Sequence, residues 1–571
     1  LMKNFATESG KSKGQFYTPA EVSRIMARVI GLGPHTTPQE TIYDMACGSG
    51  SLLLKAADEA LGNITIYGQE MDVATWSLAK MNMILHGHPD ADLRRGNTLS
   101  DPHFRADAHA ARGGTGLRTF DYAVANPPFS AKSWTSGVDP VNDPFNRFVY
   151  GVPPAKNGDY AFLLHMLASL KSTGTGAIIL PHGVLFRGNK EAEIRRNLVK
   201  RGFIKGIIGL PANLFFGTGI PAAIIVLDKR DAVSRETIFM VDASKGFIKE
   251  GPKNRLRSQD IHRIVDTFTN AREIPRYSRA VPIAEIADPA NDYNLNIPRY
   301  IDSSEPEDLH DLTGHLAGGI PTADVDALQR YWEIMPNLRA VLFAPGPRPG
   351  YVNAVVAPRE VTPTITSHPE FAAFADRLRS ATDAWTVAHR PALTTVAVND
   401  RPRELIAALS EDLLTRLADL PLLDPYDAYQ CLMDYWAETM QDDVYLIAAD
   451  GWTVAALPRP IIEDKERKIK ETADLTVAKK KFKMDLIPPS LIESRFFAAQ
   501  TAHLNELTAA RDAAEAQLTE YVEEHTGDEG LLSDVVNDKG TLVKGDLKSR
   551  LKVISDDPEF EDEREALSRA Q

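Results

Sequence analysis

Short apolar runs alternate with helix-like segments between about residues 40 and 230. The runs are rich in Ile, Val, Ala and Tyr and are typical of strands: TIYDMA, ITIYGQE, FDYAVAN, TGAIILP, IKGIIGLP and PAAIIVLDK. The segments between them include GSLLLKAADEAL, ATWSLAKMNMILHG, YAFLLHMLASLK and KEAEIRRNLVKR. Continuous apolar strands that alternate with helices predict a largely parallel sheet covered on both faces. We therefore expect an α/β fold whose ligands bind beyond the carboxyl ends of the strands.

The pattern changes after residue 302. Residues 303–487 carry mixed helical and short strand signals, and we expect a mixed α/β extension of unassigned role. Residues 488–571 contain a long helical run with apolar a/d positions at Phe497, Leu504, Leu507, Ala514, Leu518 and Tyr521. This spacing predicts either a coiled-coil-like helix for partner assembly or a tail helix packed on its own domain. The predicted domains are thus 1–302, 303–487 and 488–571.

Length and composition narrow the class of protein. A chain of 571 residues is too long for one hydrophobic core. The sequence contains no apolar run of about 18 residues, so we expect no membrane span. The first residues lack the apolar core of a signal peptide. Two distant cysteines, Cys47 and Cys431, indicate a reducing, cytoplasmic setting. Metal-ligand spacing is not evident, so we expect no metal site.

The formal net charge of −14 bears on nucleic-acid binding. Contact with phosphates needs clustered Lys and Arg. Two interpretations stay open: the acidic charge lies away from a local basic cleft, or a partner supplies most of the contact with DNA.

The first candidate site is YDMACGSGSLLLKA, residues 43–56. A strand ends in Asp44, a loop with Gly48 and Gly50 follows, and a helix begins near Ser51. The loop lacks both the GK[ST] of a triphosphate-binding loop and the third glycine of the dinucleotide fingerprint. An acid at the strand end suits a cationic amine, as in the methionine part of S-adenosylmethionine. The alternative is a simple tight turn.

Two further strand ends carry polar residues. In IYGQEMD, Glu70 is expected to accept hydrogen bonds from ribose hydroxyls, with Asp72 as its neighbour. In RRGNTLSD, Asn97 is expected to bind an adenine ring edge of the cofactor. The alternatives are solvent-facing acids for the first stretch and a turn former for the second.

The stretch FDYAVANPPFSAK ends a strand in an amide, two prolines and an aromatic ring. The Asn126 side-chain oxygen and the Pro127 carbonyl can both accept hydrogen bonds from one exocyclic amino group, with Pro128 as a brace. Phe129 can stack on a base, a contact worth ~1–3 kcal/mol. These acceptors position an aromatic amine for attack on a methyl group. A plain turn is the alternative.

Taken together, these motifs resemble a known family. DMACGSG followed by NPPF, with GQFYTP before both, is similar to the gamma class of N6-adenine DNA methyltransferases. With MNMILHG, GNTL, LPHGVLFRGNKEAEIR, LPANLFFGTGIPAAIIVLDK and DYNLNIPRY, the chain resembles the modification subunit of Type I restriction–modification systems over about residues 10–302. The resemblance implies a Rossmann-like sheet that binds S-adenosylmethionine.

The resemblance also implies roles for single residues. The cofactor would be bound by Gln15, Tyr17, Thr18, Pro19, Asp44, Ala46, Gly48, Ser49, Gly50, Glu70 and Asn97. The catalytic residues would be Asn126, Pro127, Pro128 and Phe129. Phe215 or Phe216 is a candidate for the second face of a clamp around a flipped base, with core packing as the equal alternative.

The implied partners are double-stranded DNA and a separate specificity subunit, in a complex with two copies of this chain. A restriction (nuclease and translocase) subunit is a further candidate partner. A cytosine-N4 methyltransferase and an inactive assembly scaffold of the same fold remain alternatives. Such subunits usually carry a helical domain before GQFYTP, where only 13 residues precede it in this sequence. Whether an upstream helical domain is missing stays open.

Overall fold

A computed structural model describes residues 18–106, 116–215, 218–304, 310–464, 469–526, 530–537, 542–555 and 557–571. The chain divides into two compact units. The first comprises Leu1–Pro391 with Ile406–Trp436, and the second comprises Ala392–Leu405 with Ala437–Gln571. The three domains predicted from the sequence remain a prediction.

A nine-stranded sheet forms the centre of the first unit within the described residues, in the order β11-β8-β6-β7-β5-β4-β1-β2-β3. Its strands are β1 Thr41–Asp44, β2 Thr65–Glu70, β3 Asp92–Arg95, β4 Phe120–Ala125, β5 Leu170–Pro181, β6 Ile204–Gly209, β7 Ala222–Asp228, β8 Thr237–Asp242 and β11 Ser278–Pro282. The strands from β3 to β5 pair in parallel, as do β6 and β8. β7 runs antiparallel between β5 and β6, and β11 runs antiparallel at the edge. The predicted, largely parallel sheet is thereby confirmed.

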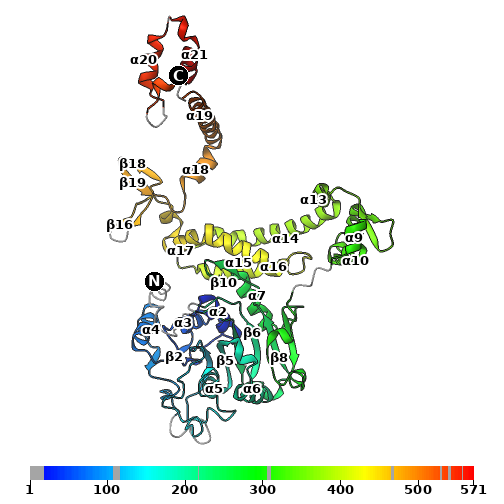
Figure 1. Ribbon diagram of the computed structural model, residues 1–571. Coiled ribbons are helices and arrows are strands. Elements are labelled where there is room, and N and C mark those ends of the chain that lie inside the picture. Colours follow the sequence, from blue (N-terminus) through cyan, green and yellow to red (C-terminus); the bar gives the residue numbers. More distant parts are fainter. Residues whose placement is uncertain are drawn as a thin grey trace. The chain divides into compact units, whose positions relative to one another are not determined.

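Helices cover both faces of this sheet (Figure 1). One layer contains α2 Ala20–Val29, α3 Ser51–Glu59, α4 Val73–Leu85 and α7 Ser258–Thr269, and the other contains α5 Asp159–Ala168 and α6 Lys190–Lys200. Alternate residues of one strand enter the two cores: Tyr122 and Val124 of β4 pack under the first layer, and Ala123 and Ala125 under the second. Because β4, β1 and β2 pair in parallel, their carboxyl ends lie together at one edge of the sheet.

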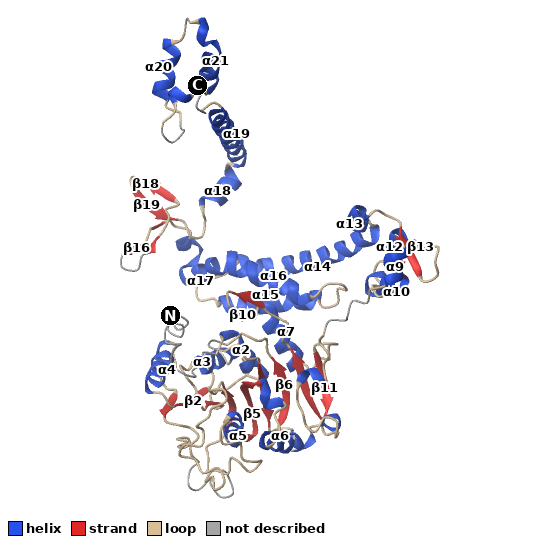
Figure 2. Ribbon diagram, viewed as in Figure 1, coloured by secondary structure: helices blue, strands red, loops and turns tan. Residues whose placement is uncertain are grey.

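The part of the first unit that follows residue 310 is mainly helical (Figure 2). Its elements are α9 Leu312–Ala317, α10 Thr322–Asp326, α11 Gln329–Trp332, α12 Pro336–Leu342, α13 Val361–Ser367, most of α14 Pro369–Thr394 and of α15 Pro402–Leu417, α16 Pro425–Tyr435 and a small sheet of β12, β14 and β13 (Ile320–Pro321, Tyr351–Ala354, Phe343–Pro345). The last residues of α14 and the first of α15 belong to the second unit. Polar contacts join α16 to α7: Gln259 donates to Asp427 (2.8 Å), and the Tyr426 hydroxyl donates to Asp266 (2.5 Å). These contacts attach the extension to the α/β part.

The second unit has its own small core. It contains α17 Gln441–Ala455, the short strands β15 Arg459–Pro460, β18 Leu475–Val477 and β19 Lys480–Lys483, and the helices α18 Pro489–Phe496, α19 Ala498–Glu524, α20 Lys544–Val553 and α21 Glu561–Ala570. The predicted helical C-terminal region is confirmed. Tyr521 packs against a cluster formed with α20 and α21, whereas Leu504 and Leu507 are 62% and 56% exposed. In the described part of the chain, the helices are too short or too polar to cross a membrane.

Candidate active site

β1 delivers a buried acid to the carboxyl edge of the sheet. The Asp44 side chain accepts a hydrogen bond from the Ala46 N–H (2.9 Å) and is 1% exposed. Burial raises the pKa of Asp44 to about 8, the Ala46 bond opposes that rise, and the negative charge of Glu70 adds to it. A cation that approaches this carboxyl would favour its ionised form and lower its pKa again. Asp44 therefore suits a positively charged ligand group.

The loop after β1 packs against α4 at Ser49 and Gly50, whereas the space next to Gly48 is open. Gly48 and Gly50 have left-handed φ angles of +54° and +77°, which favour glycine. A Cβ at Gly48 would meet no atom within 4 Å, whereas one at Gly50 would lie 2.9 Å from the Met83 Cε of α4. Asn82 of α4 donates to the Ser49 carbonyl (3.1 Å). A ligand can thus approach the backbone at Gly48.

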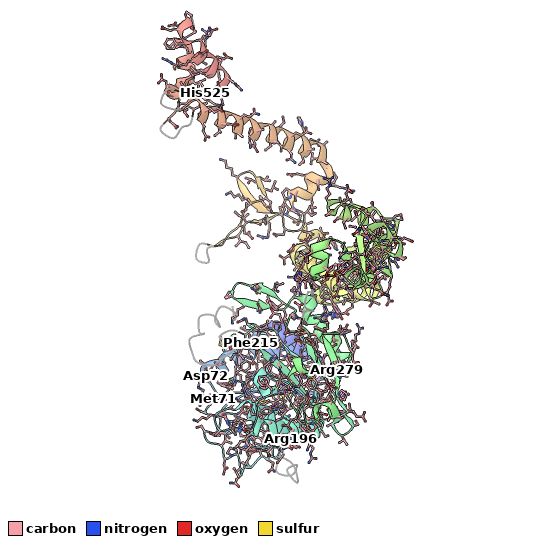
Figure 3. All side chains as sticks on the ribbon, turned by 45° about the vertical axis from the view of Figure 1, so that its right-hand side comes forward. Met71, Asp72, Arg196, Phe215, Arg279 and His525 are labelled. Carbon is pink, nitrogen blue, oxygen red and sulfur yellow. The ribbon has the colours of Figure 1, made fainter. Side chains whose placement is uncertain are left out.

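Glu70 ties the loop after β1 to the end of β2. Its Oε2 accepts the Gly48 N–H (3.0 Å), and its Oε1 accepts the Asp72 N–H (2.8 Å). Burial raises the pKa of Glu70, and the backbone N–H bonds oppose this. Asp72 instead caps α4, because its Oδ1 accepts the Thr75 N–H (2.9 Å). Met71, which no motif singles out, lies beside Asp72 at the surface (Figure 3) and is 66% exposed.

Asn97 forms a turn that lies next to the same loop. Its Oδ1 accepts the Leu99 N–H (3.0 Å), and its carbonyl accepts the Asp101 N–H (2.8 Å), as the turn-former alternative predicts. Thr98 donates from its hydroxyl to the Met45 carbonyl (2.6 Å), which joins the turn to the loop after β1. The contact of Asn97 with an adenine ring stays a prediction.

The Asn126 amide at the end of β4 is oriented by a residue far upstream. Its Nδ2 donates to the Thr18 hydroxyl (2.9 Å), 108 residues away in sequence. Its Oδ1 is buried and has no hydrogen-bond partner among the residues that the structure describes. A buried acceptor without a partner costs about 1–3 kcal/mol, and a ligand that donates a hydrogen bond to it would remove this cost. The bond to Thr18 fixes the orientation of the amide, so that among the described residues its oxygen stays available to accept a hydrogen bond from a ligand.

Two contacts hold the rest of the motif after β4. The Phe129 ring meets the Phe215 ring edge to face, with centroids 5.9 Å apart and planes at 70°. Ser130 has a φ of +51°, and its N–H donates to Asp159 of α5 (2.6 Å). Pro127 is buried and Pro128 is exposed.

Phe215 is only 1% exposed, so its ring supports Phe129 from within the core. A role as a second stacking face stays a prediction for Phe215. The predicted positions Gln15, Tyr17 and Phe216 lie outside the described residues.

A buried polar network, which no motif indicated, lies behind the loop after β1. The Arg147 guanidinium and the Asp143 carboxylate form an almost fully buried ion pair (2.7 Å). Arg147 also donates to the Thr98 carbonyl (3.4 Å). The Tyr43 hydroxyl and His165 Nε2 are 3.3 Å apart. Burial and the neighbouring Arg147 hold the pKa of His165 well below its usual value, so the imidazole is neutral. The network braces the turn at Asn97 against β1.

Comparison with known proteins identifies the family of the part of the chain that contains the sheet. The family model described as N-6 DNA Methylase matches residues 1–309, more than half of the chain. The chain therefore belongs to the N-6 DNA methylase family, and the recognised resemblance is confirmed.

Several individual proteins are similar in sequence to this chain. The chain is 35% identical to the Type I restriction enzyme MpnII methylase subunit of Mycoplasma pneumoniae, over 54% of this chain and 57% of that subunit. It is 33% identical to the MjaVII methylase subunit of Methanocaldococcus jannaschii, over 55% and 54%. A solved methyltransferase subunit of a Type I system from Streptococcus thermophilus is 40% identical, with a TM-score of 0.48 over 53% of this chain and 62% of that one. The chain spans about half the length of the curated relatives it matches.

Proposed function

We propose that this chain is the modification subunit of a Type I restriction–modification system. It would transfer a methyl group from S-adenosylmethionine to the N6 amino group of an adenine extruded from double-stranded DNA. The observation that carries the proposal is the Asn126 amide at the strand end beside the Asp44 and Glu70 loops, because its oxygen accepts no hydrogen bond from any residue that the structure describes. Family membership and the names of the relatives support the same reaction.

The residues around the first two strand ends fit the proposed cofactor. When bound, S-adenosylmethionine supplies an activated methyl group on a sulfonium. Asp44 would hold the cationic amino acid end, since its buried carboxyl gains most from a nearby positive charge. Glu70 would accept the ribose hydroxyls with the lone pairs that the two backbone bonds leave. The open space over Gly48 allows close approach of the ligand to the backbone.

The NPPF motif would act on the target base. Asn126 Oδ1 and the Pro127 carbonyl accept the two hydrogens of the adenine amino group, which raises the electron density on its nitrogen. Phe129 stacks on the ring of the base, a contact worth about 1–3 kcal/mol. Extrusion of the base costs a few kcal/mol, because the amino group is otherwise paired within the duplex.

The proposal includes partners. With a net charge of −14, the chain is poorly suited to bind DNA by itself, so a specificity subunit would read the sequence. The 27-residue helix α19, with Leu504 and Leu507 exposed, offers a surface for such an assembly. A restriction subunit and a second copy of this chain belong to the proposed complex. Its setting would be the reducing cytoplasm, where genomic DNA is available.

Co-expression with the specificity subunit, followed by transfer of a labelled methyl group to DNA, tests the proposal. Asn126→Ala should bind S-adenosylmethionine normally yet lose about 100-fold or more in transfer, because a preorganised acceptor is removed. Asp44→Ala should weaken cofactor binding instead. Asn63→Ala, at an exposed asparagine before β2, is the matched control and should change neither. Undiminished transfer by Asn126→Ala, or N4-methylcytosine as the product, would overturn the proposal.

A further inference from the structure

A basic hairpin lies beside the candidate active site in a chain that is acidic overall. The strands β9 Ile248–Glu250 and β10 Lys253–Arg255 pair antiparallel around an exposed tip at Gly251 and Pro252 (β10 is labelled in Figure 1). One acid, Glu250, stands among five basic residues of the surrounding stretch 245–257: Lys245, Lys249, Lys253, Arg255 and Arg257. The local charge is therefore opposite in sign to the net charge of −14.

The hairpin is fastened to the loop that supports Phe129. Lys253 Nζ donates to the carbonyls of Phe215 (2.6 Å) and Thr218 (3.2 Å). Asn254 donates from its backbone N–H to the Asn213 carbonyl (3.1 Å) and from its side chain to the Ala212 carbonyl (2.7 Å). Since Phe215 packs against Phe129, these bonds place the hairpin next to the NPPF motif. The hairpin and the acceptors for the base thus form one connected structure.

The basic side chains of the stretch divide into two groups. Lys253 and Lys245 donate to backbone carbonyls of the fold, the latter to that of Ser303, and Arg257 pairs with Asp260 at the start of α7 (2.9 Å). Lys249 is exposed and has no ion pair among the described residues, and Arg255 pairs only with the exposed Glu250 (3.1 Å). An exposed ion pair is worth at most about 1 kcal/mol, so a phosphate can compete for Arg255. Lys249 and Arg255 are therefore available to an external anion.

We propose that this hairpin binds the sugar–phosphate backbone of the duplex beside the extruded adenine. This inference rests on the proposed function. When a base enters the NPPF site, the phosphates on either side of it come close to that site. Lys249 and Arg255 then neutralise them, which holds the strand in register and contributes no sequence preference. The hairpin supplies the local basic surface that the net charge alone does not reveal.

The test uses the complex with the specificity subunit and compares two double variants. Lys249→Gln with Arg255→Gln removes the exposed charges of the hairpin. Arg201→Gln with Lys205→Gln removes two exposed charges where α6 passes into β6, at the ends of the strands away from the candidate site. Each double variant also removes one ion pair, Arg255 with Glu250 (3.1 Å) or Lys205 with Asp228 (3.8 Å). Duplex affinity is measured from low to high salt, with the recognised sequence and with a scrambled one. Cofactor affinity and thermal unfolding are measured in parallel.

The hairpin variant should weaken the binding of both duplexes by about tenfold. The slope of log K against log salt, which is negative, should become less steep by about 1–2, one unit per phosphate contact. Cofactor affinity and the unfolding temperature should stay at wild-type values, and the control variant should behave as wild type. An unchanged slope, or a loss confined to binding of the specificity subunit, would refute the inference. A wild-type complex that transfers no methyl group would instead refute the proposed function, and this inference with it.

Discussion

The buried Asp44 makes cofactor binding depend on pH in a way that can be worked out in advance. Its pKa is raised to about 8, so the carboxyl is about 1% ionised at pH 6 and about 9% at pH 7. Below pH 7 the amino group of the cofactor stays protonated, since α-amino groups titrate near pH 7.7–8.0. If the ionised carboxylate binds that amine, affinity should rise about tenfold between pH 6 and pH 7.

Calorimetry in buffers of different ionisation enthalpy measures both the affinity and the protons released. About 0.7–0.8 proton should leave per cofactor bound at pH 7, because Asp44 releases about 0.9 proton and the cofactor amine takes up about 0.1–0.2. Asp44→Asn should bind more weakly at pH 7 and show neither the tenfold rise nor the proton release. A pH-independent affinity in the wild type, or the same rise in Asp44→Asn, would refute the reasoning.

The same carboxyl affects the stability of the ligand-free chain, with a sign opposite to that of an ordinary acid. Because the folded-state pKa lies above the unfolded value, the neutral group stabilises the fold below pH ~4, and this contribution is lost as the pH rises through about 8. The unfolding temperature of the wild type relative to Asp44→Asn should therefore decline over that interval. A difference that does not vary with pH would show that burial does not raise this pKa.

Three further substitutions test the site. Thr18→Val should lower methyl transfer about 2–10-fold, because the Asn126 amide loses a hydrogen bond worth about 0.5–1.5 kcal/mol; Thr18→Ser should restore the rate, and equal losses in both would count against this role. Gly50→Ala should destabilise the chain by about 1–2 kcal/mol, measured by denaturant unfolding, since its φ is +77°; an unchanged midpoint would contradict this. Arg147→Met should cost about 3–5 kcal/mol in the same assay, because a buried carboxylate loses its partner; a loss below 1 kcal/mol would show that the pair contributes little.

The sequence predicted the alternating strands and helices well because buried parallel strands are continuously apolar and helices are not. It did not predict the direction of β7. All seven residues of β7 are buried, so the strand has the same apolar pattern whether it runs parallel or antiparallel. The extension after residue 302 was assigned only in outline, because its attachment to α7 depends on single polar contacts such as Gln259 with Asp427.

The sequence predicted which residues form the candidate site, but it did not predict the hydrogen bonds between them. Asp44 and Glu70 are the last residues of their strands and Asn126 follows β4, and the order of these strands brings all three to one edge of the sheet. The bond between Thr18 and Asn126 joins positions 108 residues apart, and no local pattern reports such a pair. Asp72 illustrates the opposite case, since a local rule, the preference of Asp for helix N-caps, explains its position better than a role in ligand binding.

Glu70 has two separate roles: it binds two backbone N–H groups within the fold, and it is proposed to bind the ribose of the cofactor. Each of its carboxylate oxygens already accepts a backbone N–H, one from Gly48 and one from Asp72. A glutamine of the same shape would turn an NH2 group toward one of those donors, and one backbone bond would be lost. The connection between the two loops would weaken even if no ribose ever bound there, although the bond from the Cys47 N–H to the Gln69 carbonyl would remain. An acid at this position thus stabilises the loops of the ligand-free chain as well as offering acceptors to a ligand.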